Sequence, residues 1–131
     1  MTIVADVSAV VEFLLQTERN EAHKNALKKA DWVIAPELYI SEISNVLWKY
    51  FRARVLDEDT AIRLIENGLE LIDDFIPAKE IWREAFLESL QNNHAVYDMM
   101  YLITARRNGG LLITLDKKLA KIAKTMKIKL I

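Results

Sequence analysis

The stretch that decides the fold is Thr2-Ile3-Val4-Ala5-Asp6, where four residues typical of a β-strand end at an acid. A helix-like run over residues 7–15 follows at once, so the chain opens with the first half of a βα unit. The same order recurs near the other end, where the apolar run 111–115 precedes Asp116 and a helical segment over 117–125. Two such units predict parallel strands joined by helices.

The segments between these units alternate in the same way. Further strands are expected at residues 31–35, which Pro36 stops, at 74–76, and at 128–131. Further helices are expected at 20–30, 37–53, from near 59, at 79–91 and at 96–107. Right-handed crossovers between such strands predict an α/β fold, a three-layer α/β/α sandwich with a mainly parallel central sheet. No repeat or linker divides residues 1–131, so we expect a single domain.

Composition excludes several classes of protein. The 131 residues are 52% hydrophobic and 28% charged with only three Gly and two Pro, which indicates a helix-rich globule rather than a disordered chain. The absence of cysteine excludes disulfides, zinc-thiolate sites and cysteine nucleophiles, so any metal must be held by oxygen or imidazole. The N-terminus lacks a leader pattern, and no run approaches the roughly 18 apolar residues of a membrane span, so we expect a cytoplasmic protein.

Asp6 and Asp116 directly follow the two clearest strands. In an open parallel sheet, ligands bind beyond the carboxyl ends of the strands, which makes acids at that edge candidate site residues. An aspartate before a helix can also cap the helix by accepting a backbone N–H, and for either residue alone this interpretation is equally good. As a pair at the ends of two apolar strands, they indicate a shared site.

Two more acids lie on predicted helices. Asp98 shares an apolar face with Tyr101 and Leu102, where an isolated carboxylate needs a partner, a metal or the positive end of a helix. Glu42 lies at the margin of the apolar face of its own helix. For Glu42, a simple pair with Lys49 or exposure to solvent is an open alternative.

Carboxylates gathered at one edge would repel one another unless cations neutralised them. Mg²⁺ or Mn²⁺ is the natural choice, because these ions prefer oxygen ligands. Such ions, held by a few carboxylates and the substrate phosphate, suit hydrolysis of a phosphodiester bond. The predicted metal ligands and catalytic residues are therefore Asp6, Glu42, Asp98 and Asp116.

Four segments that contain these acids resemble the PIN domain family, particularly the VapC-type toxins of prokaryotic toxin–antitoxin pairs. The segments are Ile3-Val4-Ala5-Asp6-Val7-Ser8, Ser41-Glu42-Ile43-Ser44-Asn45-Val46-Leu47, Ala95-Val96-Tyr97-Asp98-Met99-Met100-Tyr101-Leu102 and Leu112-Ile113-Thr114-Leu115-Asp116-Lys117-Lys118-Leu119. Each motif alone is weak, but four in order with helices between them, over nearly the whole chain, are specific.

The resemblance implies a magnesium-dependent endoribonuclease in which the four acids bind metal and RNA is the substrate. Ser8, Asn45 and Thr114 would then be supporting polar residues, although an N-cap, a helix-surface amide and a strand-end hydroxyl describe them equally well. The resemblance further implies a cognate antitoxin protein as partner and a homodimer.

Other functions remain open. A phosphoryl-accepting receiver domain also places acids at strand ends, but Asp57 and Asp59 follow no strand, which disfavours it. A binding module could keep the fold without turnover, and an RNA-processing nuclease could act without a toxin role. Retention of all four acids argues against the binding module.

The remaining polar and aromatic residues have ordinary interpretations. His23 and His94 are predicted surface histidines, and the six lysines in residues 117–131 are more simply a solvated face than a phosphate-binding surface. Lys49, Arg52 and Arg54 could touch RNA phosphates. Core packing or a dimer contact is the favoured role, ahead of base stacking, for a set of aromatic residues: Trp32, Trp48, Tyr50, Phe51, Trp82 and Phe86.

Overall fold

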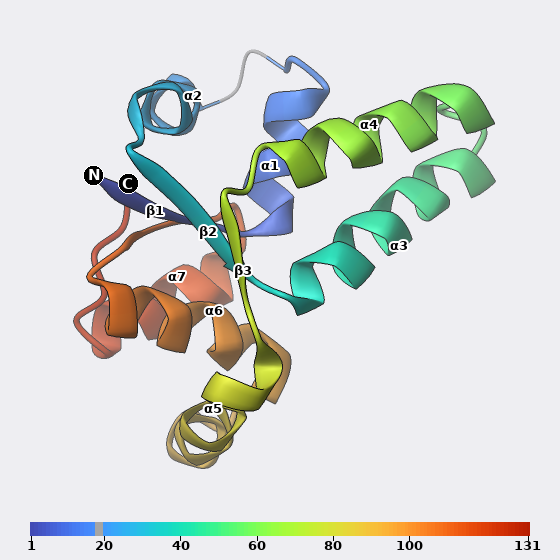
Figure 1. Ribbon diagram of the computed structural model, residues 1–131. Helices are drawn as coiled ribbons and strands as arrows, with labels where there is room; N and C mark the ends of the chain where they lie inside the picture. Colours follow the sequence, from blue (N-terminus) through green and yellow to red (C-terminus); the bar gives the residue numbers. More distant parts are fainter. Residues whose placement is uncertain (18–19) are drawn as a thin grey trace.

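The computed structural model describes residues 1–17 and 20–131. Within these ranges the chain forms a four-stranded parallel sheet in the order β3-β2-β1-β4, with helices on both faces (Figure 1). The strands are β1 (Thr2–Ala5), β2 (Trp32–Pro36), β3 (Asp74–Ile76) and β4 (Leu111–Ile113). The helices are α1 (Val7–Leu14), α2 (Glu21–Lys29), α3 (Leu38–Arg52), α4 (Glu58–Glu70), α5 (Ala78–Asn92), α6 (Val96–Asn108) and α7 (Lys117–Thr125). The predicted α/β sandwich with a parallel sheet is confirmed.

β1 lies inside the sheet because it is apolar on both sides. Ile3, Val4 and Ala5 are fully buried, and β1 pairs in parallel with β2 on one side and β4 on the other. Helices cover both faces of such a sheet, so neither face needs polar residues. The backbone N–H of Asp6 donates to the carbonyl oxygen of Ile113 at 3.1 Å, which places this acid at the carboxyl ends of β1 and β4.

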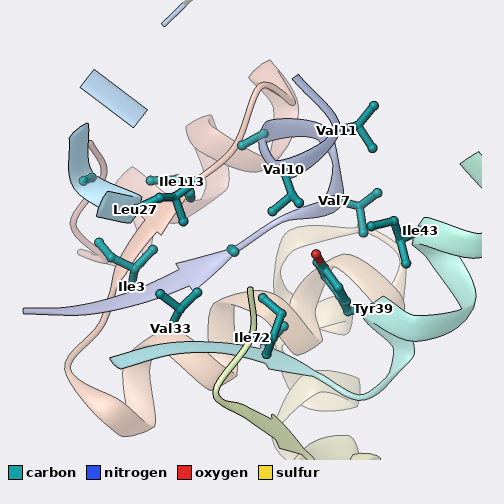
Figure 2. Close-up of a cluster of buried hydrophobic side chains, with 14 of the residues drawn as sticks. Ile3, Val7, Val10, Val11, Leu27, Val33, Tyr39, Ile43, Ile72 and Ile113 are labelled. Atoms are coloured by element: carbon teal, nitrogen blue, oxygen red, sulfur yellow. The ribbon is translucent and has the colours of Figure 1, made fainter. Parts of the chain in front are cut away.

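Two hydrophobic cores form the layers on either side of the sheet. Successive strand residues face opposite layers, so Ile3 belongs to one core and Val4 to the other. Figure 2 shows the first core, in which side chains of α1 and α3 pack over β1 and β2; its labelled residues include Val7, Val10, Val33, Tyr39 and Ile43. The second core joins the sheet to α5, α6 and α7 through residues such as Ile81, Met99, Leu102, Leu112 and Leu119.

β4 is shorter than the predicted run over 111–115. The backbone amides of Leu115 and Asp116 bond to side chains instead of to a neighbouring strand. The N–H of Leu115 donates to Ser8 Oγ at 3.0 Å, and the N–H of Asp116 donates to Thr114 Oγ1 at 3.0 Å. The strand therefore ends early and its last residues form a turn held by hydroxyl groups.

The predicted C-terminal strand over 128–131 is reduced to one bridge, between Leu130 and Leu112. Leu112 makes the bridge through two backbone bonds: its N–H donates to the carbonyl oxygen of Lys129, and its carbonyl oxygen accepts the N–H of Ile131. The prediction of a surface position for His23 is also wrong. His23 is buried, and its ring Nε2 lies 3.1 Å from the carbonyl oxygen of Ile131, because the C-terminus lies against α2.

α3 and α4 form a hairpin that extends away from the sheet (Figure 1). Tyr39 Oη donates to the carbonyl oxygen of Gly68 at 2.8 Å, in the buried contact between the two helices. A Cβ atom at Gly68 would lie 2.2 Å from Cδ1 of Ile43, so a larger residue here would have to displace that buried side chain. The contact fixes α3, and with it Glu42, relative to the sheet.

Several aromatic residues lie on the surface rather than in the core. Trp48 and Phe51 of α3, and Trp82 and Phe86 of α5, are each about half exposed, so core packing was the wrong interpretation for them. These side chains leave apolar surface on two helices. None of the described helices is long and apolar enough to cross a membrane.

Candidate active site

Asp6 is the most buried of the four acids, with 8% of its surface exposed. Its Oδ2 accepts hydrogen bonds from Ser8 Oγ at 2.9 Å and from Thr114 Oγ1 at 2.6 Å. The pKa of Asp6 is raised, chiefly by burial. The hydrogen bonds from Thr114 and Ser8 lower it, and the charges of Asp98 and Asp116 raise it. Asp6 is therefore a desolvated carboxylate held by neutral donors.

Ser8 and Thr114 connect the ends of β1 and β4. Each hydroxyl donates its proton to Asp6, and each accepts a backbone N–H from the turn after β4, Ser8 from Leu115 and Thr114 from Asp116. Both hydroxyls thus use their donor and an acceptor position. Through these bonds Ser8 and Thr114 hold Asp6 in place relative to the start of α7. The bonds give a physical reason for the supporting role proposed for the two residues.

Asp116 is the N-cap of α7. Its Oδ1 accepts the N–H groups of Lys118 at 2.9 Å and Leu119 at 3.1 Å, so the capping interpretation is correct for this acid. Both bonds use the same oxygen, and no described residue hydrogen bonds to Oδ2. Capping and a second role at the other oxygen are therefore compatible.

Glu42 lies on α3 and contacts α6. Its Oε1 accepts the Tyr101 hydroxyl at 2.9 Å, and no described lysine or arginine pairs with it, so the pair with Lys49 does not form. The pKa of Glu42 is raised to about 7, chiefly by desolvation; the Tyr101 hydrogen bond lowers it, and the charges of Asp6 and Asp98 raise it. Glu42 faces the same group of acids as Asp6.

Asp98 lies in the first turn of α6, where the positive end of the helix favours a carboxylate. His94 Nε2 lies 2.5 Å from Asp98 Oδ2, and the two side chains are 20% and 32% exposed. The prediction of a surface histidine is thus wrong for His94, which is largely covered and contacts a site acid. Asn45, in contrast, is exposed on α3 and makes no described hydrogen bond with the four acids.

The site carries negative charge without a permanent cation. Asp6 lies within electrostatic reach of Glu42, Asp98 and Asp116, and none of these acids forms a described salt bridge with lysine or arginine. A divalent cation would offset the charge of these acids, and their carboxylate oxygens are ligands that such an ion prefers. No three acidic or histidine side chains of the described residues lie close enough to hold an ion by themselves. Mg²⁺ commonly keeps several waters and takes few direct carboxylate ligands, so it does not require three such side chains at one point.

Comparison with known proteins identifies relatives of the whole chain. A family model described as PIN domain matches residues 3–125. Ribonuclease VapC3 of Pyrobaculum aerophilum is 34% identical over 126 residues, covering 92% of this chain and 94% of that protein.

Three solved structures are similar in fold. PAE2754 from Pyrobaculum aerophilum has a TM-score of 0.72 and 22% identity, with 92% of this chain and 86% of that chain covered. VapBC2 from Rickettsia felis, bound to a promoter DNA fragment, has a TM-score of 0.67 and 12% identity, with 100% of this chain and 98% of that chain covered. FitAcB from Neisseria gonorrhoeae has a TM-score of 0.64 and 17% identity, with 98% of this chain and 95% of that chain covered. At these identities the likeness establishes the architecture alone.

Proposed function

Because the chain belongs to the PIN domain family, we propose that it is a metal-dependent endoribonuclease that hydrolyses RNA phosphodiester bonds and acts as the toxin of a toxin–antitoxin pair. The observation that carries the proposal is the buried Asp6 carboxylate, fixed by two hydroxyls among three further acids and without a cationic partner. Similarity to a protein named a ribonuclease supports the substrate class. A cytoplasmic location belongs to the same proposal.

Each acid has a part to perform in this reaction. Asp6, Glu42, Asp98 and Asp116 would hold Mg²⁺ or Mn²⁺, which supplies a Lewis acid to activate water and to offset charge on the phosphate. Asp6 contributes a carboxylate oriented by Ser8 and Thr114. The Tyr101 hydroxyl orients Glu42, which must be deprotonated to act as a ligand. Asp116 can use Oδ2 while Oδ1 caps α7.

His94 is a positioning residue in this proposal. Its Nε2 contacts Oδ2 of Asp98, so His94 orients the Asp98 carboxylate and leaves Oδ1 for the metal. Residues that hydrogen bond to metal ligands commonly orient them in this way. We expect His94→Leu to lower the metal affinity of the nuclease by about tenfold, and His94→Gln, which keeps a donor, to lose less. A matched Mn²⁺ titration of cleavage for both variants measures this, and equal loss in the two would contradict a hydrogen-bonding role.

The test of the proposal is cleavage by the purified chain. We expect it to cut a labelled, unstructured RNA internally when Mg²⁺ or Mn²⁺ is present and to be inactive in chelator. A DNA strand of the same sequence is the matched substrate, and we expect it to remain intact. Metal-independent cleavage, or no cleavage of any RNA supplied with metal, would overturn the proposal.

An antitoxin is the proposed protein partner, since two of the similar structures are named as VapBC2 and FitAcB. We propose that it inhibits by placing an Arg or Lys side chain among the acids, because this group lacks a cation and Arg forms a forked pair with carboxylates. Inhibition should therefore compete with Mn²⁺. If the affinity of a cognate partner is unaffected by Mn²⁺ and by Asp6→Asn, the partner binds elsewhere.

A homodimer is the proposed assembly. Its support is the half-exposed apolar surface of α3, at Trp48 and Phe51, and of α5, at Trp82 and Phe86. Light scattering on the purified chain distinguishes a dimer from a monomer. A monomer at micromolar concentration would contradict this part of the proposal.

A further inference from the structure

A third of the basic residues of this chain, six of 18, lie in its last segment, which contains no acid. All 19 acidic residues lie at or before Asp116, whereas residues 117–131 hold six lysines and no acid. Each of these lysines is exposed, and none forms a salt bridge in the described part of the chain. The protein with net charge −1 therefore carries a strongly positive surface over α7 and the residues that follow it.

Three of these lysines form a row along α7, which we call the lysine row: Lys117, Lys121 and Lys124. Their spacing of four and three residues places them on one face of the helix, opposite the buried Leu119 and Ala123. At 1.5 Å per residue the row extends about 10 Å along the helix axis. It starts at the residue next to Asp116, so the row adjoins the candidate active site.

The basic surface continues beyond the end of the helix. Lys127 and Lys129, with Arg106 of α6, line a cavity of about 250 Å³ next to Gly109 and Gly110. Arg106 is engaged by the carboxylates of α5, but the two lysines have no such partner in the described structure. An anionic chain laid along the row would therefore meet positive charge at both ends.

Helix stability does not explain this arrangement. Lys117 and Lys118 occupy the first turn of α7, which contains no acid, and the helix macrodipole disfavours cations there. Lysines selected only to solvate or stabilise α7 would be better placed in its last turn. An anion bound outside the helix would account for the positive first turn.

We propose that the lysine row binds the phosphate backbone of RNA and leads the strand to the carboxylate site, an inference that rests on the proposed nuclease function. RNA is the ligand because the row adjoins Asp116, one of the predicted metal ligands, so a backbone bound there continues into the site. Lysines contact phosphates as point charges and read no bases, so the row supplies affinity without sequence preference.

Binding can be measured separately from cleavage. The Asp98→Asn chain is titrated into a fluorescent, unstructured RNA at several salt concentrations, with and without Lys117→Gln, Lys121→Gln and Lys124→Gln together. Each lost phosphate contact changes the slope of log K against log salt by about 0.7, so the slope should fall by about 2 and binding at about 0.1 M salt should weaken by roughly ten- to a hundredfold. The matched control replaces the exposed Lys28, Lys29 and Lys79 with Gln, which removes the same charge elsewhere.

Cleavage provides the second readout, using chains that keep Asp98. The triple Gln variant should lose more kcat/KM on a long RNA than on a dinucleotide, which is too short to extend along the row. Lys→Arg at the same positions should restore both binding and cleavage. Equal salt slopes for the row variant and the control variant would overturn the proposal. It would also be overturned if the row variant lost as much affinity for duplex DNA, or for anionic vesicles, as it lost for RNA. Wild-type protein that binds RNA through the row but never cleaves it would refute the nuclease function and leave the row as an RNA-binding surface.

Discussion

Glu42→Gln tests the electrostatics of the site most sharply, because the change removes a charge and keeps the shape. The pKa of Glu42 is raised from 4.5 to about 7, first by desolvation and then by the charges of Asp6 and Asp98. The folded protein thus binds a proton at Glu42 more tightly than the unfolded chain does. Stability linked to this group is highest below pH 4.5 and falls as the pH rises towards 7.

The size of the fall follows from the pKa shift. At about 1.4 kcal/mol per pKa unit, the full shift would correspond to roughly 3 kcal/mol in the free energy of unfolding. Glu42 is only half-buried, so screening by solvent reduces the expected effect to about 1–2 kcal/mol. The amide that replaces the carboxylate in Glu42→Gln has no such titration and can still accept the Tyr101 hydroxyl, so the variant should lack this part of the pH dependence.

The assay is urea unfolding of both chains in metal-free buffer between about pH 4 and pH 8. The gap between Glu42→Gln and wild type should grow in favour of the variant by about 1–2 kcal/mol between pH 4.5 and 7, then remain level. Glu66→Gln, which changes an exposed glutamate on α4, is the matched control and should leave the pH profile unchanged. A gap between Glu42→Gln and wild type that does not change with pH would refute the reasoning.

Two further predictions concern packing and metal binding. Gly68→Ala places a methyl group 2.2 Å from Ile43 Cδ1, and we expect it to lower the free energy of unfolding by about 1–3 kcal/mol in a urea titration. Wild-type stability in this variant would show that the Ile43 side chain moves aside without cost. Asp6→Asn with Asp116→Asn should raise stability in chelator, because it removes repulsion, and should abolish the increase in melting temperature that Mn²⁺ gives the wild type. At a hundred times Kd that increase reflects about 2.7 kcal/mol, and a wild-type melting curve indifferent to Mn²⁺ would contradict a shared ion.

Much of the fold could be predicted because its signals are local. The apolar run that ends at Asp6, and the run before Asp116, identify β1 and β4 without knowledge of any partner, although β4 lies at the edge of the four-stranded sheet rather than inside it. The end of β4 could not be placed from such a pattern, because Ser8, from a distant segment, takes the backbone N–H of Leu115. The extent of the C-terminal strand likewise depends on a distant segment, since its one bridge joins Leu130 to Leu112 of β4.

The site shows the same division between local and distant information. The positions of Asp6 and Asp116 follow from strand ends, but the partner of Glu42 is Tyr101, on a helix far away in sequence. Contacts between helices of different segments have no local signature. His94 carried a usable signal, since it lies four residues before Asp98, yet its position just ahead of the helix favoured a surface interpretation.

The central claim is that these carboxylates hold the metal used to cut RNA, and the most direct measurement is Mn²⁺-dependent cleavage of labelled RNA by Asp98→Asn. The control is Glu80→Gln, which removes an acid from the first turn of α5 as Asp98→Asn does from α6. We expect Asp98→Asn to keep its fold by circular dichroism and lose about a hundredfold or more in cleavage rate, with Glu80→Gln close to wild type. A folded Asp98→Asn chain that cuts RNA at the wild-type rate would contradict the claim.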